Sequence, residues 1–139
     1  MATGLLAGGL LTEARILVPY WRQMPTEDFL KLHHTMAPSL YRYFAPLTVM
    51  GTISPILACI FVSAPNRVVE SAWLISAVSA LLLLGFYLFF FRSANNTFSK
   101  TTDVEVAKPI LEKWASMHTI RTWIACVSFL SAILASIMA

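Results

Sequence analysis

Residues 71–91 read SAWLISAVSALLLLGFYLFFF, a run of 21 residues without a charged side chain. A helix of about 20 apolar residues is long enough to cross the roughly 30 Å of hydrocarbon in a lipid bilayer. The run therefore predicts a membrane-spanning helix over 70–92.

The composition of the whole chain agrees with a membrane protein. Hydrophobic residues make up 58% and charged residues 12% of the 139 positions, whereas soluble domains have about 45–50% and 25%. Cys59 and Cys126 lie in apolar runs and form no CxxC pair, which favours small buried side chains over a disulfide framework. No repeat or low-complexity tract divides the chain, so a single integral membrane domain over 1–139 is expected.

Three further segments complete the predicted fold. The charge-free stretch 44–64 predicts a second span, and the last 18 residues, also without charge, predict a span over 119–139. The N-terminal segment 2–22 has no basic residue before Arg15, and Glu13 interrupts its apolar core, so we expect a retained span and not a cleaved signal peptide. The sequence thus predicts an all-α protein, a four-helix transmembrane bundle.

Basic residues are distributed unevenly over the expected connections. Three Lys or Arg residues fall in 22–43 and five in 92–121, but 65–70 holds only Arg67. Cytoplasmic loops of membrane proteins carry an excess of Lys and Arg. This pattern predicts that 22–43 and 92–121 face the cytoplasm and that both termini lie on the non-cytoplasmic side.

A short amphipathic helix is expected at the membrane interface within 22–43. A Pro-Thr pair precedes two acidic residues, which is typical of a helix start, and Pro38 is expected to end the segment. The residues that share the face toward the membrane are Phe29, Leu32, His33 and Met36. In the other connection, 93–102 is polar and predicts a turn, and 104–117 predicts a helix that leads into the last span.

Glu13 is an unusual residue for a membrane span. It lies about 14 Å from Arg22 along a helix, which places it near the expected bilayer centre. A carboxylate there is costly unless it is paired, protonated or bound to a metal. Arg15 lies about 200° around the helix from Glu13 and cannot neutralise it within one helix. Two interpretations stay open: a protonated, purely structural acid, or a ligand or proton carrier.

Trp114, His118 and Arg121 are four and three residues apart, directly before the last apolar run. That spacing places all three on one face of a helix. An imidazole and a guanidinium that face the same way at the mouth of an apolar bundle indicate a shared inward pocket. His118 and Arg121, together with Glu13, are therefore the candidate catalytic residues.

Metal binding is a separate hypothesis. The three histidines of the chain form no local metal motif such as HExxH. Two of them with Glu13 would supply the donor set of a non-haem iron facial triad. The candidate metal ligands are His34, His33, His118 and Glu13, and non-haem iron, copper and no cofactor at all stay open.

Three stretches of the chain, GLLAGGLL…VPYWRQMPTEDFLKLHHTMAPSLYRYFAPL, FFRSANNTF and W…MHTIRT, carry short motifs. The motif positions are Gly4, Gly8, Pro19, Trp21, Phe29, Pro46, Asn95 or Asn96, Trp114, His118 and Arg121. In these positions the chain resembles the anthrone oxygenase-like family of small four-helix membrane proteins. The resemblance implies a four-helix membrane fold and oxygenation of an anthrone-like carbon.

The leading hypothesis is a membrane-embedded oxidoreductase, a monooxygenase that acts on a small hydrophobic aromatic or phenolic substrate at the cytoplasmic side. Such a reaction needs a base, groups that hold an oxyanion, and a dry pocket that admits oxygen. His118 is expected to be the base because imidazole titrates near neutral pH. The expected oxyanion-binding residues are Arg121, Arg42, Asn95 and Asn96, and the expected ring-binding residues are Trp114, Trp21 and Phe29.

Two other functions stay open. In a non-enzymatic subunit of a larger complex, Trp114, His118 and Arg121 would form an interfacial belt, and Glu13 and Arg15 would pair across an oligomer interface. A small proton-coupled carrier would use Glu13, but four spans without an inverted repeat would have to oligomerise. The expected partners are the lipid bilayer and a small hydrophobic substrate, with a homo-oligomer left open and no nucleic acid.

Overall fold

The computed structural model describes all 139 residues, which form helices joined by three short connections. Four continuous helical rods follow one another along the chain, as predicted. The first rod is α1 (Ala2–Thr12), the π-helical turn η1 (Glu13–Leu17) and α2 (Val18–Gln23); the second is α3 (Thr26–Phe61). The third is α4 (Arg67–Phe86), the π-helical turn η2 (Tyr87–Phe91) and α5 (Arg92–Lys100); the fourth is α6 (Val104–Met138).

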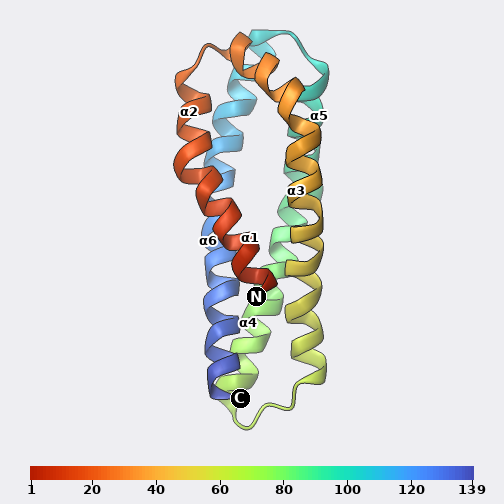
Figure 1. Ribbon diagram of the computed structural model, residues 1–139, viewed down its shortest axis with the longest axis vertical. Coiled ribbons are helices and arrows are strands. Elements are labelled where there is room, and N and C mark those ends of the chain that lie inside the picture. Colours follow the sequence, from red (N-terminus) through yellow and green to blue (C-terminus); the bar gives the residue numbers. More distant parts are fainter.

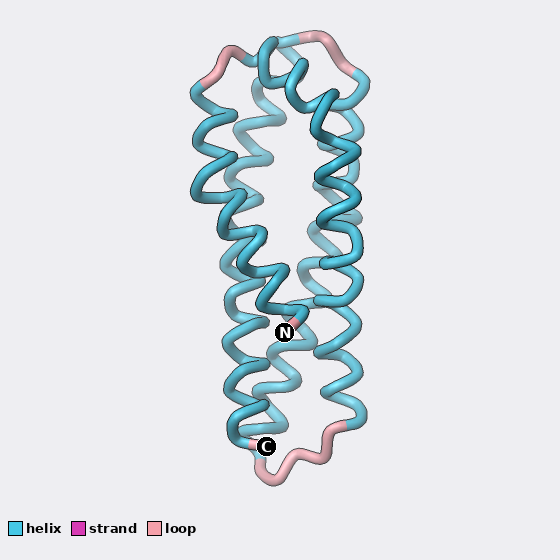
Figure 2. Tube along the Cα trace, in the orientation of Figure 1, coloured by secondary structure: helices cyan, strands magenta, loops and turns pink.

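The rods run side by side along one long axis (Figure 1). The α2–α3 and α5–α6 connections lie together at one end of the bundle, which we call the double-loop end (Figure 2). The α3–α4 connection and the C-terminus lie at the opposite end. The N-terminus lies part-way along the bundle, because the first rod is shorter than the other three.

Polar residues at the helix starts explain where α4 and α6 begin. The Asn66 side chain accepts hydrogen bonds from the backbone N–H groups of Val68 and Val69 at 3.0 and 3.1 Å. Asp103 accepts one from the N–H of Glu105 at 2.9 Å. Such caps satisfy backbone donors that have no partner inside the first turn of a helix.

The expected interfacial helix is not a separate element. It forms the first turns of α3, which continues through Pro38, Pro46 and Pro55 as one helix of 36 residues. The prediction that the helix ends at Pro38 is therefore wrong. Proline inside an apolar helix is tolerated where neighbouring helices and local adjustment satisfy the freed backbone groups.

The expected turn over 93–102 is also helical, because most of it belongs to α5. Ala94 and Phe98 are buried against the other rods, and this burial favours the helix over a turn. The hydroxyl groups of Thr97 and Ser99 donate to carbonyl groups four residues earlier, at 3.1 and 3.0 Å. In contrast, the prediction of a helix over 104–117 that leads into the last span is confirmed.

Three helices are long and apolar enough to cross a membrane: Thr26–Phe61, Arg67–Lys100 and Val104–Met138. The first rod, predicted as a span over 2–22, is not among them. The three helices contain 34–36 residues each, about 50 Å of helix, so they extend well beyond the roughly 30 Å of hydrocarbon. Three of the predicted spans, 44–64, 70–92 and 119–139, thus fall largely within longer helices.

Large apolar side chains are exposed on the half of the bundle that ends in the α3–α4 connection. They include Val49, Met50, Ile53, Leu57, Ile60 and Phe61 of α3, Leu74, Ile75, Val78, Leu81 and Leu82 of α4, and Val127, Leu130, Ile133, Leu134 and Ile137 of α6. Exposed apolar surface on this scale marks contact with a membrane or with another protein. This exposed surface agrees with the three long apolar helices, which suggest a membrane protein.

Small residues let α4 and α6 approach closely. Ser76 and Ser128, both buried, donate hydrogen bonds to each other's backbone carbonyl groups at 2.8 and 3.0 Å. Small polar residues of this kind are typical of helix contacts in membrane proteins.

Gly51 marks a close approach between α3 and α1. A Cβ atom at this position would lie 2.8 Å from Cδ2 of Leu6, a side chain that is only 3% exposed. Since a larger side chain at this position must displace Leu6 from its packing, Gly51→Leu is expected to lower the free energy of unfolding by about 1–3 kcal/mol. Thermal unfolding in detergent micelles measures the change.

Gly8→Leu is the matched control for this prediction, because nothing lies within 4 Å of a Cβ atom at Gly8. Both variants replace a helical glycine of the α1–α3 region by the same side chain. The packing described for Gly51 is wrong if the two variants unfold at the same temperature.

Candidate functional site

A cavity of about 360 Å³ lies inside the bundle, and its lining is mostly hydrophobic. All four rods contribute to its wall. Along α3 the lining extends from Phe29 to Val49, about 30 Å of helix. The cavity therefore runs from the double-loop end toward the middle of the bundle. An apolar cavity with a few convergent polar groups is the usual form of a small-molecule site.

Glu13 and Arg121 meet at the wall of this cavity. The Oε2 atom of Glu13 lies 3.9 Å from Nη2 of Arg121, and the two side chains are only 6% and 13% exposed. The Arg121 guanidinium also lies over the ring of Phe91, 4.4 Å from its centroid, which is a cation–π contact. Arg15 is exposed on the surface, so Glu13 is the charge of this segment that faces the interior.

Polar atoms of this pair have no hydrogen-bond partner in the chain. Oε2 of Glu13 and Nε of Arg121 are both buried and unsatisfied. An unsatisfied buried polar group carries a desolvation penalty of about 1–3 kcal/mol, more when it is charged.

Two π-helical turns flank the charged pair. η1 begins at Glu13, and η2 contains Tyr87, which lines the cavity, and Phe91, which contacts Arg121. Next to η1, the Leu10 carbonyl accepts hydrogen bonds from His118 Nε2 at 3.3 Å and from Thr122 Oγ1 at 3.4 Å. Isolated π-helical turns are rare and occur frequently at functional sites.

His118 does not line the cavity, contrary to its predicted role as the base that meets the substrate. It is fully buried, and its ring stacks on that of Trp114 with a centroid distance of 4.9 Å and an interplanar angle of 3°. Its Nε2 atom lies 3.6 Å from Oε2 of Glu13 and bonds to the Leu10 carbonyl. His118 therefore supports Trp114 and joins α6 to α1. The basic group that does line the cavity is the carboxylate of Glu13.

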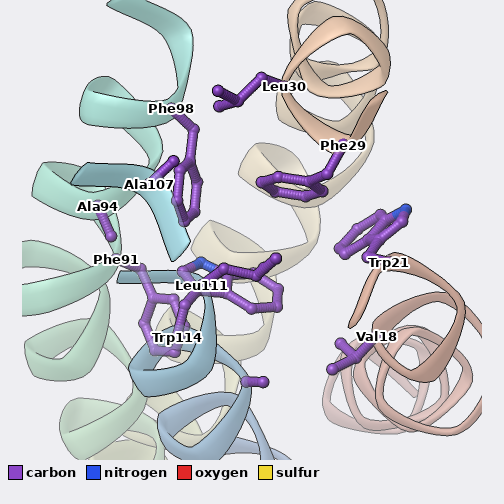
Figure 3. Packing of buried hydrophobic residues seen from close by; sticks show 11 residues of the cluster. Val18, Trp21, Phe29, Leu30, Phe91, Ala94, Phe98, Ala107, Leu111 and Trp114 are labelled. Atoms are coloured by element: carbon purple, nitrogen blue, oxygen red, sulfur yellow. The ribbon is translucent and has the colours of Figure 1, made fainter. Parts of the chain in front are cut away.

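Aromatic rings from different rods surround the cavity at the double-loop end (Figure 3). Trp21 of α2, Phe29 of α3, Phe98 of α5 and Trp114 of α6 point toward one another. Ring centroids lie 6.0 Å apart for Trp21 and Phe29, 5.9 Å for Trp21 and Trp114, and 5.1 Å for Phe29 and Phe98. The structure thus brings the three predicted ring-binding residues together and adds Phe98.

One face of α5 supplies a polar part of the wall. Its polar lining residues are Arg92, Asn95, Asn96 and Ser99, with the spacing of a single helix face. Asn95 Oδ1 accepts a hydrogen bond from Trp114 Nε1 at 3.0 Å. Both predicted asparagines therefore line the cavity.

Arg42, by contrast, is exposed and does not line the cavity, so the structure does not bring it together with the other predicted site residues. In this part of α3 the cavity is lined by Leu40 and Phe44 and by the edge of the exposed Tyr41. Arg92 is the further cation of the cavity wall, and the sequence interpretation missed it. The spacing of Arg92 to Asn95 and Asn96 fits one helix face, but the predicted turn over 93–102 hides this signal.

The predicted metal site is not formed, since no group of three His, Cys, Asp or Glu side chains comes together. The ring of His33 lies 5.8 and 5.4 Å from those of Phe29 and Phe98, and His34 Nε2 bonds to the Phe98 carbonyl at 2.8 Å. Both histidines therefore pack against the aromatic end of the bundle, whereas His118 lies beside Glu13 and Leu10. The residues present do not fit the expected site of two histidines and a glutamate.

Comparison with known proteins provides no relative for this site. No family model, curated protein or solved structure matches the chain.

Proposed function

We propose that the protein is a multi-pass membrane enzyme that oxygenates a small, planar, hydrophobic substrate in this cavity. The observation that carries the proposal is the Glu13–Arg121 pair, with its unsatisfied polar atoms, at the wall of a mostly apolar cavity. The motif resemblance to the anthrone oxygenase-like family supports the same reaction and suggests an anthrone-like CH₂ group as the reacting centre.

In the proposed orientation, the apolar half of the bundle lies in the hydrocarbon and the first rod completes a four-helix transmembrane bundle. The distribution of basic residues favours a double-loop end in the cytoplasm, with both termini toward the other side. Arg121 then lies eighteen residues, about 27 Å, from the end of the chain. The charged pair would thus lie near the cytoplasmic surface of the hydrocarbon and not at its centre, which lowers the cost of placing charges there.

In the proposed reaction, Glu13 is the base and Arg121 holds the oxyanion. The carboxylate takes a proton from the substrate CH₂ group, and the resulting enolate oxygen pairs with the guanidinium. Molecular oxygen adds to the carbanion carbon, and the proton returns from Glu13 to the terminal peroxide oxygen. Removal of the second C–H proton breaks the O–O bond, leaves a ketone and releases hydroxide, which takes that proton to form water.

The remaining residues of the site orient the substrate and keep water away. Trp21, Phe29 and Trp114 offer aromatic surface for a planar ring system, and His118 holds Trp114 from behind through its stacked ring. The apolar side chains of the deeper wall, Leu6, Leu10, Leu83 and Leu84, provide the dry surroundings in which a reactive enolate is protected.

Anthrone is the probe that tests this function. The purified protein in lipid nanodiscs is incubated with anthrone, and anthraquinone formation and oxygen uptake are measured against empty nanodiscs. We expect a rate well above that of empty nanodiscs and equal molar amounts of oxygen consumed and anthraquinone formed. A rate equal to that of empty nanodiscs would contradict the proposal and favour a non-enzymatic membrane subunit.

A further inference from the structure

Arg92 is a cation of the cavity wall without a carboxylate partner. The charged lining residues are Glu13, Arg92 and Arg121, two guanidinium groups and one carboxylate. Glu13 faces Arg121, whereas Arg92 forms no ion pair and no hydrogen bond with any side chain of the protein. The wall therefore carries one uncompensated positive charge.

A free amide lies on the same helix face as Arg92. Asn96 follows it by four residues and lines the cavity, and its side chain makes no hydrogen bond within the chain. Asn95 differs in this respect, because its Oδ1 atom is bonded to Trp114. Arg92 and Asn96 are exposed as well as lining the cavity, so a ligand group can reach them without displacing an existing interaction. A guanidinium with a neighbouring amide is well suited to bind a carboxylate.

The two arginines approach the cavity at the same level of the bundle. Arg121 lies over the ring of Phe91, and Arg92 follows Phe91 directly in the chain. Only Arg121 has a carboxylate partner, Glu13, that offsets its charge. A neutral substrate would leave Arg92 without a partner, whereas an acidic one would complete the charge balance of the wall.

We infer that the substrate is an aromatic acid, a planar ring system with a carboxylate that binds to Arg92 and Asn96 while the reacting carbon lies at Glu13 and Arg121. The inference rests on the proposed function in taking the cavity as the substrate site. It deepens that function by naming the second group of the substrate. Arg92 is thus a specificity-determining residue.

Two fluorescent probes of the same shape test the inference without any oxygenation. They are anthracene-2-carboxylate and its uncharged analogue 2-(hydroxymethyl)anthracene, titrated into the protein in phosphatidylcholine nanodiscs. The wild-type protein is expected to bind the carboxylate about tenfold more tightly than the alcohol, the ratio that corresponds to ~1.4 kcal/mol. Arg92→Gln should reduce this ratio to about one and leave the affinity for the alcohol unchanged, while Arg92→Lys should retain part of the preference.

Arg42→Gln is the matched control, because it removes the same charge from an exposed residue that does not line the cavity. This variant should keep the wild-type ratio. Equal losses in Arg92→Gln and Arg42→Gln would overturn the inference, since the preference would then come from general surface charge. If Arg92→Gln keeps the wild-type ratio of affinities for the two probes, the inference is overturned as well. That result would favour binding of lipid phosphate by Arg92.

The two proposals fail separately. If the protein oxidises anthrone but shows no preference for the carboxylate probe, the inference of an acidic substrate is refuted and the proposed oxygenase function stands. If the protein prefers the carboxylate probe through Arg92 but does not oxidise anthrone, the proposed oxygenase function is refuted. The cavity would then still be a binding site for aromatic acids.

Discussion

Glu13→Gln is expected to lower the rate of anthraquinone formation by about 100-fold or more, the usual contribution of a positioned general base. The amide is nearly the same size as the carboxylate but cannot take a proton from the substrate. Affinity for the uncharged anthracene probe should change little, because the cavity keeps its shape. The measurement is the initial rate with anthrone in nanodiscs, expressed per folded protein.

Glu112→Gln is the control for Glu13→Gln. Glu112 is an exposed glutamate that pairs with Arg22 at 2.6 Å on the surface, and it does not line the cavity that contains Glu13. It should retain the wild-type rate. Full activity in Glu13→Gln would remove Glu13 from the reaction and with it the proposed mechanism.

Arg121→Gln is expected to be among the most destabilising single changes in the chain. It leaves the Glu13 carboxylate buried without its cation, and breaking a buried pair in this way lowers the free energy of unfolding by about 3–5 kcal/mol. We expect about 3 kcal/mol, the lower end, because the two charged atoms are 3.9 Å apart and do not form a short hydrogen bond. Thermal unfolding in micelles measures the loss.

The double variant Glu13→Gln/Arg121→Gln separates this charge effect from a loss of packing. It leaves neither a buried anion nor a buried cation, so it should be clearly more stable than Arg121→Gln alone. It should also remain inactive, because it lacks both the base and the oxyanion-binding group. If the two single changes simply add in the double variant, Glu13 and Arg121 are not coupled.

The four helices could be predicted because their signal is local. The charge-free run of 71–91 and the last 18 residues each exceed or approach the length of a span, whatever the rest of the chain does. The extents of α3 and α5 depend instead on tertiary contacts. The burial of Phe98 favours a helix for the segment of α5, and α3 continues through the exposed Pro38; neither outcome can be read from composition.

The candidate site was predictable where it depends on spacing within one helix. Trp114 and Arg121 lie seven residues apart, two helical turns, and both line the cavity. Glu13 was found because a carboxylate is rare among apolar residues. The sequence interpretation failed where it needed the rotation of one helix against another, as with Arg42, which points outward, and His118, which lies behind Trp114.

A crystal structure of the protein with anthraquinone, grown from a lipidic phase, is the most direct test of the central claim that the cavity is a binding site for a planar hydrophobic molecule. The account predicts electron density for the rings inside the bundle, against Trp114 and with a carbonyl oxygen close to Arg121. Anthraquinone bound only to the outer, lipid-facing surface of the helices, or a cavity closed by the side chains that line it, would contradict the account.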